Sequence, residues 1–212
     1  ANLAAVFQRY GSGTSSLSWT IEGVTETGTP FTVTNRGMFW SQYDASITVN
    51  KLASSLYALS FNRHTRVTFT TVHVTGSITE QRLEGVISRI RTSTSLQPAL
   101  RSRNVVQVRP GGKLRVEVTF VPSDGVGPNR VGTFTVRVPS WARGMQRIEL
   151  RGGRDRPYIS DRGAGSFEGL LQILSGGDHR NDLIVSGPFG RSSFEQDVIV
   201  EGRGSFALKV VR

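Results

Sequence analysis

The residues with the most obvious chemical potential are three histidines, because the chain has no cysteine. None stands in the H-x-x-x-H or H-E-x-x-H spacing that brings two imidazoles to one metal ion. His64 falls in a predicted turn, and His73 lies between two valines of a predicted strand, on its expected solvent face. His179 follows Asp178 in a loop that continues to Asp182, and such carboxylates usually cap turns. We therefore predict no metal site and no paired-carboxylate site.

Two serines, Ser166 and Ser193, come nearest to a nucleophile motif. Ala164 and Glu168 occupy the positions where G-x-S-x-G would require glycines around Ser166, so that serine is better explained as a helix N-cap. A catalytic triad is recognised by geometry and not by order, so a hydrolase with dispersed catalytic residues remains an alternative. The glycines of residues 11–13 precede a predicted strand, whereas a phosphate loop precedes a helix. No catalytic residue and no cofactor are assigned.

The tryptophans are candidates for a ligand platform. Trp19 is in phase with Leu17 and Ile21, which predicts a core position. Trp141 follows Pro139 in a predicted loop and is the best candidate for an exposed, ligand-facing aromatic ring.

The formal net charge is +10, and 23 of the 26 basic residues are arginines. Most are dispersed at the outward positions of predicted strands, as Arg115 and Arg137 are. Such a surface predicts weak, salt-dependent affinity for anionic polymers or lipid headgroups. The densest basic cluster is the other candidate ligand-facing surface, although aspartates interrupt it; it comprises Arg151, Arg154, Arg156 and Arg162.

The size of the chain, 212 residues, suits one large all-β domain or two small ones. A globule of this length buries roughly 70% of the surface of its unfolded chain, so it needs no disulfide or metal to fold. No apolar run approaches the roughly 20 residues of a membrane helix, and no signal-like segment opens the chain. The first residue is Ala1, so we expect a processed or excised piece of something longer.

Residues 105–153 show the clearest pattern. Apolar side chains alternate with polar ones at Leu114, Val116, Val118 and Phe120, and again from Phe134 onward. Because side chains of a strand point to opposite faces with period two, this pattern predicts strands with one dry and one solvated face. Strands are expected at residues 113–121, 132–139 and 147–150, with a further candidate at 182–186.

Two segments change to helical spacing. The apolar residues Ile47, Leu52, Leu56 and Leu59 predict a helix at about residues 44–59. A second helix is predicted at about 166–174, with Ser166 as N-cap and a glycine pair as its stop. The shift of apolar phase in the strand after residue 67 predicts a bulge between residues 69 and 72. A strand around 83–91 is expected to pair with that strand.

We predict a mainly β fold: one or more immunoglobulin-like β-sandwich modules with two short helices packed on or beside the sheets. Residues 1–104 form a β-rich N-terminal part with the helix at about 44–59. Residues 105–212 form the immunoglobulin-like module with the helix at about 166–174 and the C-terminal strands. The connection at residues 92–103 is short for a free linker, so the two parts can also form one continuous domain.

The second half of the chain also resembles a known family. It is similar to the C-terminal regions of bacterial proteins with a SpoIVB-type serine peptidase domain. The similarity lies in the order of several short motifs: a P-G turn leading to a V-x-V-x-V-T strand, a V-x-V-P strand, a strand ending in G-G, an S-F-x-x-L-L helix, an R-N-D strand and a final V-x-V strand. In this chain they occupy residues 108–119, 136–139, 144–153, 166–174, 180–185 and 200–211.

The resemblance implies a non-catalytic region, because the family's Gly/Ser-framed catalytic serine motif does not occur in this chain. It further implies an exported or cell-envelope protein of bacterial origin, with a protein partner or its own peptidase domain as the neighbour of this module. We therefore expect a non-catalytic binding or structural β-sandwich module.

Two further alternatives come from charge and strand content. One is a nucleic-acid-coating or capsid-like β protein, suggested by the basic surface. The other is a self-assembling surface subunit, because residues 205–211 carry only Lys209 as an edge-protecting charge. That strand, if exposed, would add to a neighbouring sheet.

Overall fold

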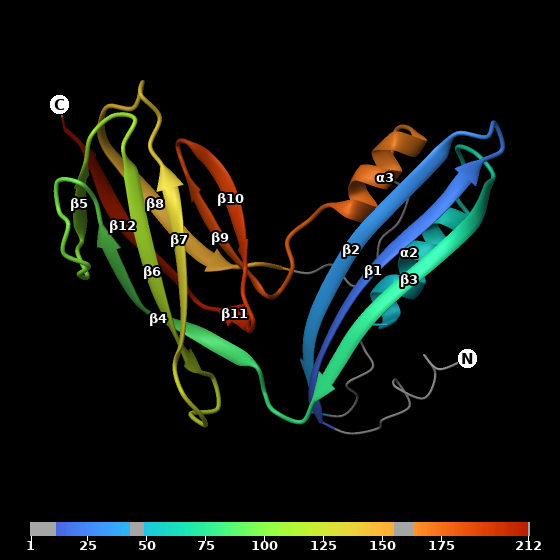
Figure 1. Ribbon diagram of the computed structural model, residues 1–212, viewed down its shortest axis with the longest axis horizontal. Coiled ribbons are helices and arrows are strands. Elements are labelled where there is room, and N and C mark those ends of the chain that lie inside the picture. The colour runs from blue at the N-terminus through green and yellow to red at the C-terminus, as the bar shows by residue number, and fades with distance from the viewer. Residues whose placement is uncertain (1–11, 43–48, 155–162, 212) are drawn as a thin grey trace. The chain divides into compact units, whose positions relative to one another are not determined.

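A computed structural model describes residues 12–42, 49–154 and 163–211 (Figure 1). The chain divides into two compact units, and neither is continuous in sequence. The first comprises residues 1–82 and 154–180, and the second comprises residues 83–153 and 181–212. These units differ from the division expected at residues 104 and 105. Which residues belong to which unit depends on strand pairing, and the alternation of side chains within a single strand does not specify its partner.

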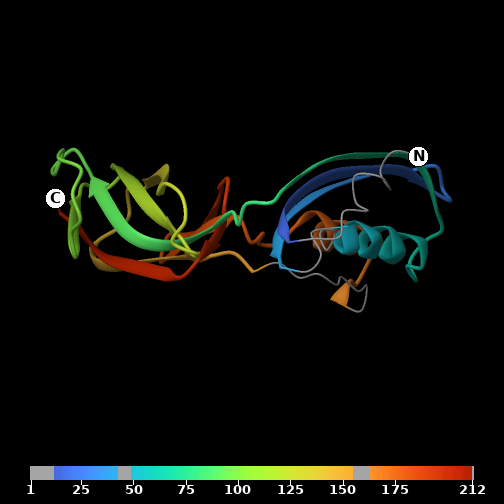
Figure 2. The same ribbon diagram turned by 90° about the horizontal axis from the view of Figure 1, so that it is seen from below.

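The first unit contains a three-stranded antiparallel sheet with two helices on one face (Figure 2). Its strands are β1 (Gly13–Thr25), β2 (Pro30–Ser41) and β3 (Val67–Thr79), in the order β2-β1-β3. The helices are α2 (Val49–Ser60) and α3 (Phe167–Ser175). The alternate side chains of β1 and β2 that face inward form one core with the apolar sides of both helices. This core contains Leu17, Trp19, Ile21, Phe31, Val33, Leu52, Leu59, Phe167, Leu170 and Leu174.

The predicted bulge in β3 is confirmed. The β1–β3 register passes from Glu22 opposite Thr71 to Gly23 opposite Phe69, which leaves Thr70 as the extra residue. The prediction of which strand pairs with β3 was wrong, however. The strand at residues 84–93 pairs in the second unit, and β3 pairs with β1.

Both helices follow the predicted apolar periodicity. The Ser166 hydroxyl accepts a hydrogen bond of 3.0 Å from the amide of Gly169, so its predicted N-cap role in α3 is confirmed. The described part of α2 begins at Val49. The earlier residues of the helix predicted at 44–59 lie outside the described residues.

The second unit consists of two sheets. One has the order β11-β4-β6-β7, and the other has the order β10-β9-β8-β12-β5. Neighbouring strands are antiparallel except in the pairs β11–β4 and β12–β5. The strands of the first sheet are β4 (Glu84–Ser93), β6 (Lys113–Pro122), β7 (Arg130–Arg137) and β11 (Ile199–Glu201). Those of the second are β5 (Val105–Val108), β8 (Gly144–Gly152), β9 (Asp182–Gly187), β10 (Gly190–Glu195) and β12 (Arg203–Val210).

The two sheets of the second unit share one hydrophobic core. The inward residues predicted from the alternation of β6, Leu114, Val116, Val118 and Phe120, are all buried. They pack with residues of the other sheet such as Ile148, Leu150, Phe206 and Leu208. The prediction of a mainly β fold with two helices is thereby confirmed for the described residues.

Most of the C-terminal strand has a neighbour on both sides. β12 pairs with β8 over Arg203–Val210 and with β5 over residues 207–210, so residues 203–206 keep one free side. Over residues 207–210 the free edge needed for self-assembly through residues 205–211 is therefore absent. Neither described helix has the length and apolar character needed to cross a membrane.

Candidate functional site

A groove opens on one side of the second unit, between the free edges of β7 and β10. Within the described residues β7 pairs only with β6, and β10 pairs only with β9. Each strand therefore has one row of backbone donors and acceptors without a partner strand. The two edges belong to different sheets.

The groove is closed at the end where β7 begins. The rings of Phe134 and Phe194 stack across it with centroids 4.4 Å apart. Arg130 forms an ion pair with Asp197 in the same region. A Cβ at Gly132 would overlap the side-chain amide of Gln196, so this side chain lies directly against the backbone of β7. Beyond these contacts the groove extends toward Arg137 and Phe189, and its volume is about 610 Å³.

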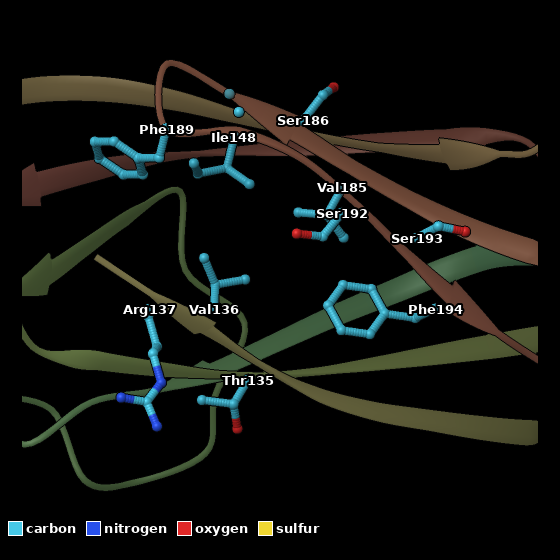
Figure 3. A pocket seen from close by; sticks show the side chains of 12 residues that line it. Thr135, Val136, Arg137, Ile148, Val185, Ser186, Phe189, Ser192, Ser193 and Phe194 are labelled. Carbon is cyan, nitrogen blue, oxygen red and sulfur yellow. The ribbon is translucent and has the colours of Figure 1, made fainter. Parts of the chain in front are cut away.

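The side chains along the groove separate into an inner and an outer set (Figure 3). Val136 of β7 faces Val185 of β9 and Ser192 of β10 across the space, with Ile148 and Phe189 at its wall. On the same strands the alternate residues point away from this space. The outward set is Thr135, Arg137, Ser186 and Ser193. The interior is therefore mainly apolar, and its rim is polar.

The outer side of β7 carries positive charge. Arg137 lies directly opposite Lys113 in the β6–β7 register, and Thr135 lies opposite Arg115. All three basic residues are exposed. In the described part of the chain Arg137 forms neither a hydrogen bond nor an ion pair through its guanidinium group. Its charge is available to an acidic group placed beside the strand.

Trp141, predicted to be exposed and ligand-facing, is 64% exposed. The ring of Trp141 contacts Phe189 edge-on, with centroids 5.9 Å apart. Phe189 lines the groove, so Trp141 packs behind this wall and does not line the groove itself. Of the predicted basic cluster, Arg151 is half-buried and donates a hydrogen bond to the carbonyl of Gly152. Arg154 is exposed and belongs to the segment of the first unit, whereas Arg156 lies outside the described residues. Neither Arg151 nor Arg154 lines the groove.

The histidines do not form a metal or catalytic site within the described residues. No group of three metal-ligating side chains exists there. His73 is exposed on β3, as predicted. All three histidines belong to the first unit, whereas Ser193 belongs to the second, and Ser166 caps α3.

Sequence reasoning missed a buried lysine beside His179. Lys51 of α2 is only 3% exposed, and its Nζ donates to the carbonyl of Arg36 at 2.8 Å and lies 3.1 Å from His179 Nδ1. The ammonium group is also 5.9 Å from the ring centre of Trp19. Lys51 shares a helical face with Ser55 and Leu59, so its spacing was the available signal. These contacts join α2 to the sheet and to the end of α3, which is a structural role.

The walls of the groove were also missed. In the sequence, residues 190–195 stand out only for their serines, whereas in the structure they form β10, whose Ser192 and Phe194 face inward. The alternation of these two residues was too short to indicate a strand by itself.

Comparisons with protein-family models, with curated protein sequences and with solved structures find no match for this chain. The resemblance to SpoIVB-type proteins therefore stays a prediction. The functional argument depends on the geometry of the second unit.

Proposed function

We propose that the chain is a non-catalytic protein-binding module whose second unit receives an extended polypeptide segment along the free edge of β7. The observation that carries this proposal is the coincidence of an unpaired strand edge with an apolar hollow beside it. An added strand would complete the ladder of β7, while every second side chain would enter the groove.

The inner and outer sets define the preferred segment. Side chains that enter the groove meet Val136, Val185 and Phe189, which favour apolar groups. Side chains on the opposite face lie beside Arg137, which favours carboxylates, and Lys113 and Arg115 add positive charge one strand further away on β6. The partner is thus a segment in which apolar and acidic residues alternate.

The wider setting belongs to the same proposal. Two sheets around one core suit an immunoglobulin-like support, which places binding surfaces at strand edges and loops. The motif order shared with SpoIVB-type proteins supports a module of an exported or cell-envelope bacterial protein. A peptidase domain of the same parent protein is then a natural source of the bound segment.

Filling the groove is expected to weaken peptide binding at least tenfold. The probe is a fluorescent ten-residue peptide of alternating valine and glutamate, measured by anisotropy. Ser192 points into the groove, so Ser192→Trp places an indole where the peptide side chains would lie. Ser193→Trp is the matched control, because Ser193 is the next residue on the same strand and points away. Equal losses in both variants, or no binding by the unmodified protein, would contradict the proposal.

Charge reversal at Arg137 is expected to weaken binding of the acidic peptide by about threefold to tenfold. A cross-strand charge pair contributes up to about 1 kcal/mol, and Arg137→Glu turns attraction into repulsion. A peptide of alternating valine and lysine should respond in the opposite direction. Arg109→Glu makes the same charge change at an exposed position outside the groove. An equal effect there would show that only net charge matters.

A further inference from the structure

A second hollow of about 530 Å³ lies in the second unit, between β4 and β12. Three arginines, Arg89, Arg103 and Arg203, line it, together with the polar residues Ser102, Asn104 and Ser205. Ile87, Ile90 and Phe206 supply the apolar part of its wall. No aspartate or glutamate is among the residues that line it.

The hollow exists because two ladders end there. β11 pairs only with residues 84–86 of β4, so β4 has no partner strand on that side from Ile87 to Arg91, up to the bridge between Thr92 and Arg101. β5 pairs only with residues 207–210 of β12, which leaves Arg203 to Phe206 unpaired on that side. Both sheets therefore present a free edge at this position, and the arginines stand along these edges and in the adjoining loop.

One of the three guanidinium groups is held in place. Arg103 is half-buried, and it donates hydrogen bonds to the carbonyls of Thr92 at 2.7 Å and Ala99 at 2.9 Å, with a longer one to Arg101. Carbonyl partners fix the position of the group but leave its full positive charge uncompensated. A fixed cation with donors already oriented loses little entropy when an anion binds.

The other two arginines have no neutralising partner among the described residues. Arg89 and Arg203 are exposed, and neither forms an ion pair or a side-chain hydrogen bond there. Some arginines elsewhere in the unit do form ion pairs, as Arg91 does with Glu117 and Arg147 with Glu149. By strand alternation Arg89 and Arg203 start on the solvent faces of their sheets, so they border the hollow from its rim. An anion held there would lower the repulsion among the like charges.

We propose that this hollow is a binding site for a tetrahedral oxyanion, a phosphate or sulfate group. Guanidinium groups bind such anions through paired N–H donors, and three of them match an anion with several acceptor oxygens. Ser102, Asn104 and Ser205 add neutral polar groups at the same place. The hollow is larger than a single ion, so the group can belong to an ester whose organic part lies against Ile87 and Ile90.

The test is calorimetric titration of the full chain with inorganic pyrophosphate and, in parallel, with inorganic sulfate at about 0.15 M salt. The double variant Arg89→Gln/Arg203→Gln is expected to bind tenfold to a hundredfold more weakly, since a hydrogen bond to a charged group contributes roughly a factor of ten. Both side chains are exposed, so the double variant should fold normally. Which of the two anions binds distinguishes a phosphate site from a sulfate site.

The matched control is Arg109→Gln/Lys209→Gln, which removes the same charge at exposed positions outside the hollow. Unchanged affinity in this variant supports a local site. An equal loss in both double variants would overturn the proposal and indicate diffuse attraction to a basic surface. Absence of binding to both anions by the unmodified protein would overturn it as well. A single-stranded oligonucleotide that bound without competition from pyrophosphate would place nucleic-acid affinity elsewhere and would likewise count against this site.

Discussion

Replacing Gly152 with alanine is expected to unfold the second unit. Gly152 ends β8, where the chain crosses the segment of β11. An alanine Cβ would overlap the carbonyl of Val200, far inside the 3.0 Å that real Cβ atoms keep from other atoms. The obstacle is backbone, so no side chain can rotate away. Relief would require β11 to leave its place, and Val198, Ile199 and Val200 are all buried.

The expected loss in the free energy of unfolding exceeds about 4 kcal/mol, which only core disruption or backbone clashes produce. Urea titration followed by near-ultraviolet circular dichroism would measure it, and binding of the valine–glutamate peptide should disappear in parallel. Gly163→Ala is the control, because its Cβ would meet no atom and its backbone is not in the left-handed region. That variant should change stability by less than about 1 kcal/mol. A Gly152→Ala protein with unchanged stability would show that β11 is not held against β8.

The sequence predicted local structure more reliably than pairing. The alternation of β6 indicated its four buried apolar residues, because alternate side chains of a strand share one face. Glu117, which the alternation places on the solvated face, is also buried and forms an ion pair with Arg91 of β4. The N-cap of α3 and the bulge near Thr70 were predicted for a similar reason, since each depends on a few neighbouring residues. The mainly β fold followed from the sum of these local signals.

Strand pairing depends on contacts between residues that are distant in the sequence, and the sequence did not predict these pairs correctly. β4 was expected to pair with β3, its predecessor in the chain, yet it pairs with β6 and β11. The helix α3 interrupts the second unit in sequence but packs in the core of the first. Nothing in the composition of residues 154–180 indicates which unit they join.

The candidate site was predictable only in part. Exposure of Trp141 could be predicted, because its loop position and the preceding proline are local features. The groove could not be predicted, because its position depends on which strands lie at the edges of the two sheets. The same limit explains the error about β12, whose low charge suggested an edge, whereas β5 and β8 flank its residues 207–210. The charge of a strand therefore indicates how its edge is protected only once the strand order of the sheet is known.

Replacing Trp19 with alanine is expected to destabilise the first unit by about 3–5 kcal/mol. Trp19 is 1% exposed and is the largest fully buried side chain of the chain's described part. It lies on β1 beneath the helices, and Lys51 approaches its ring. Truncation would leave a cavity and also remove the ring that faces the buried ammonium group. Thermal unfolding followed by far-ultraviolet circular dichroism would measure the loss, because this signal reports the backbone and not the tryptophan fluorescence that the substitution removes.

Trp19→Phe separates volume from polarity. The indole Nε1 is buried and has no hydrogen-bond partner within the described residues, which costs about 1–3 kcal/mol of desolvation. Phenylalanine removes that cost while it leaves a smaller cavity than alanine does, so the two effects oppose each other and the change should be below about 1.5 kcal/mol. An equal loss in both variants would show that the Nε1 group does have a partner.

The same two variants also test where binding resides. The groove and the arginine-lined hollow consist entirely of residues of the second unit, whose core contains none of the first unit's residues. Peptide affinity and pyrophosphate affinity should therefore remain within about twofold of the original values in Trp19→Ala at a temperature where its first unit is largely unfolded. If both affinities fall together with the first unit, then the binding surfaces require that unit, and the assignment of function to the second unit alone is wrong.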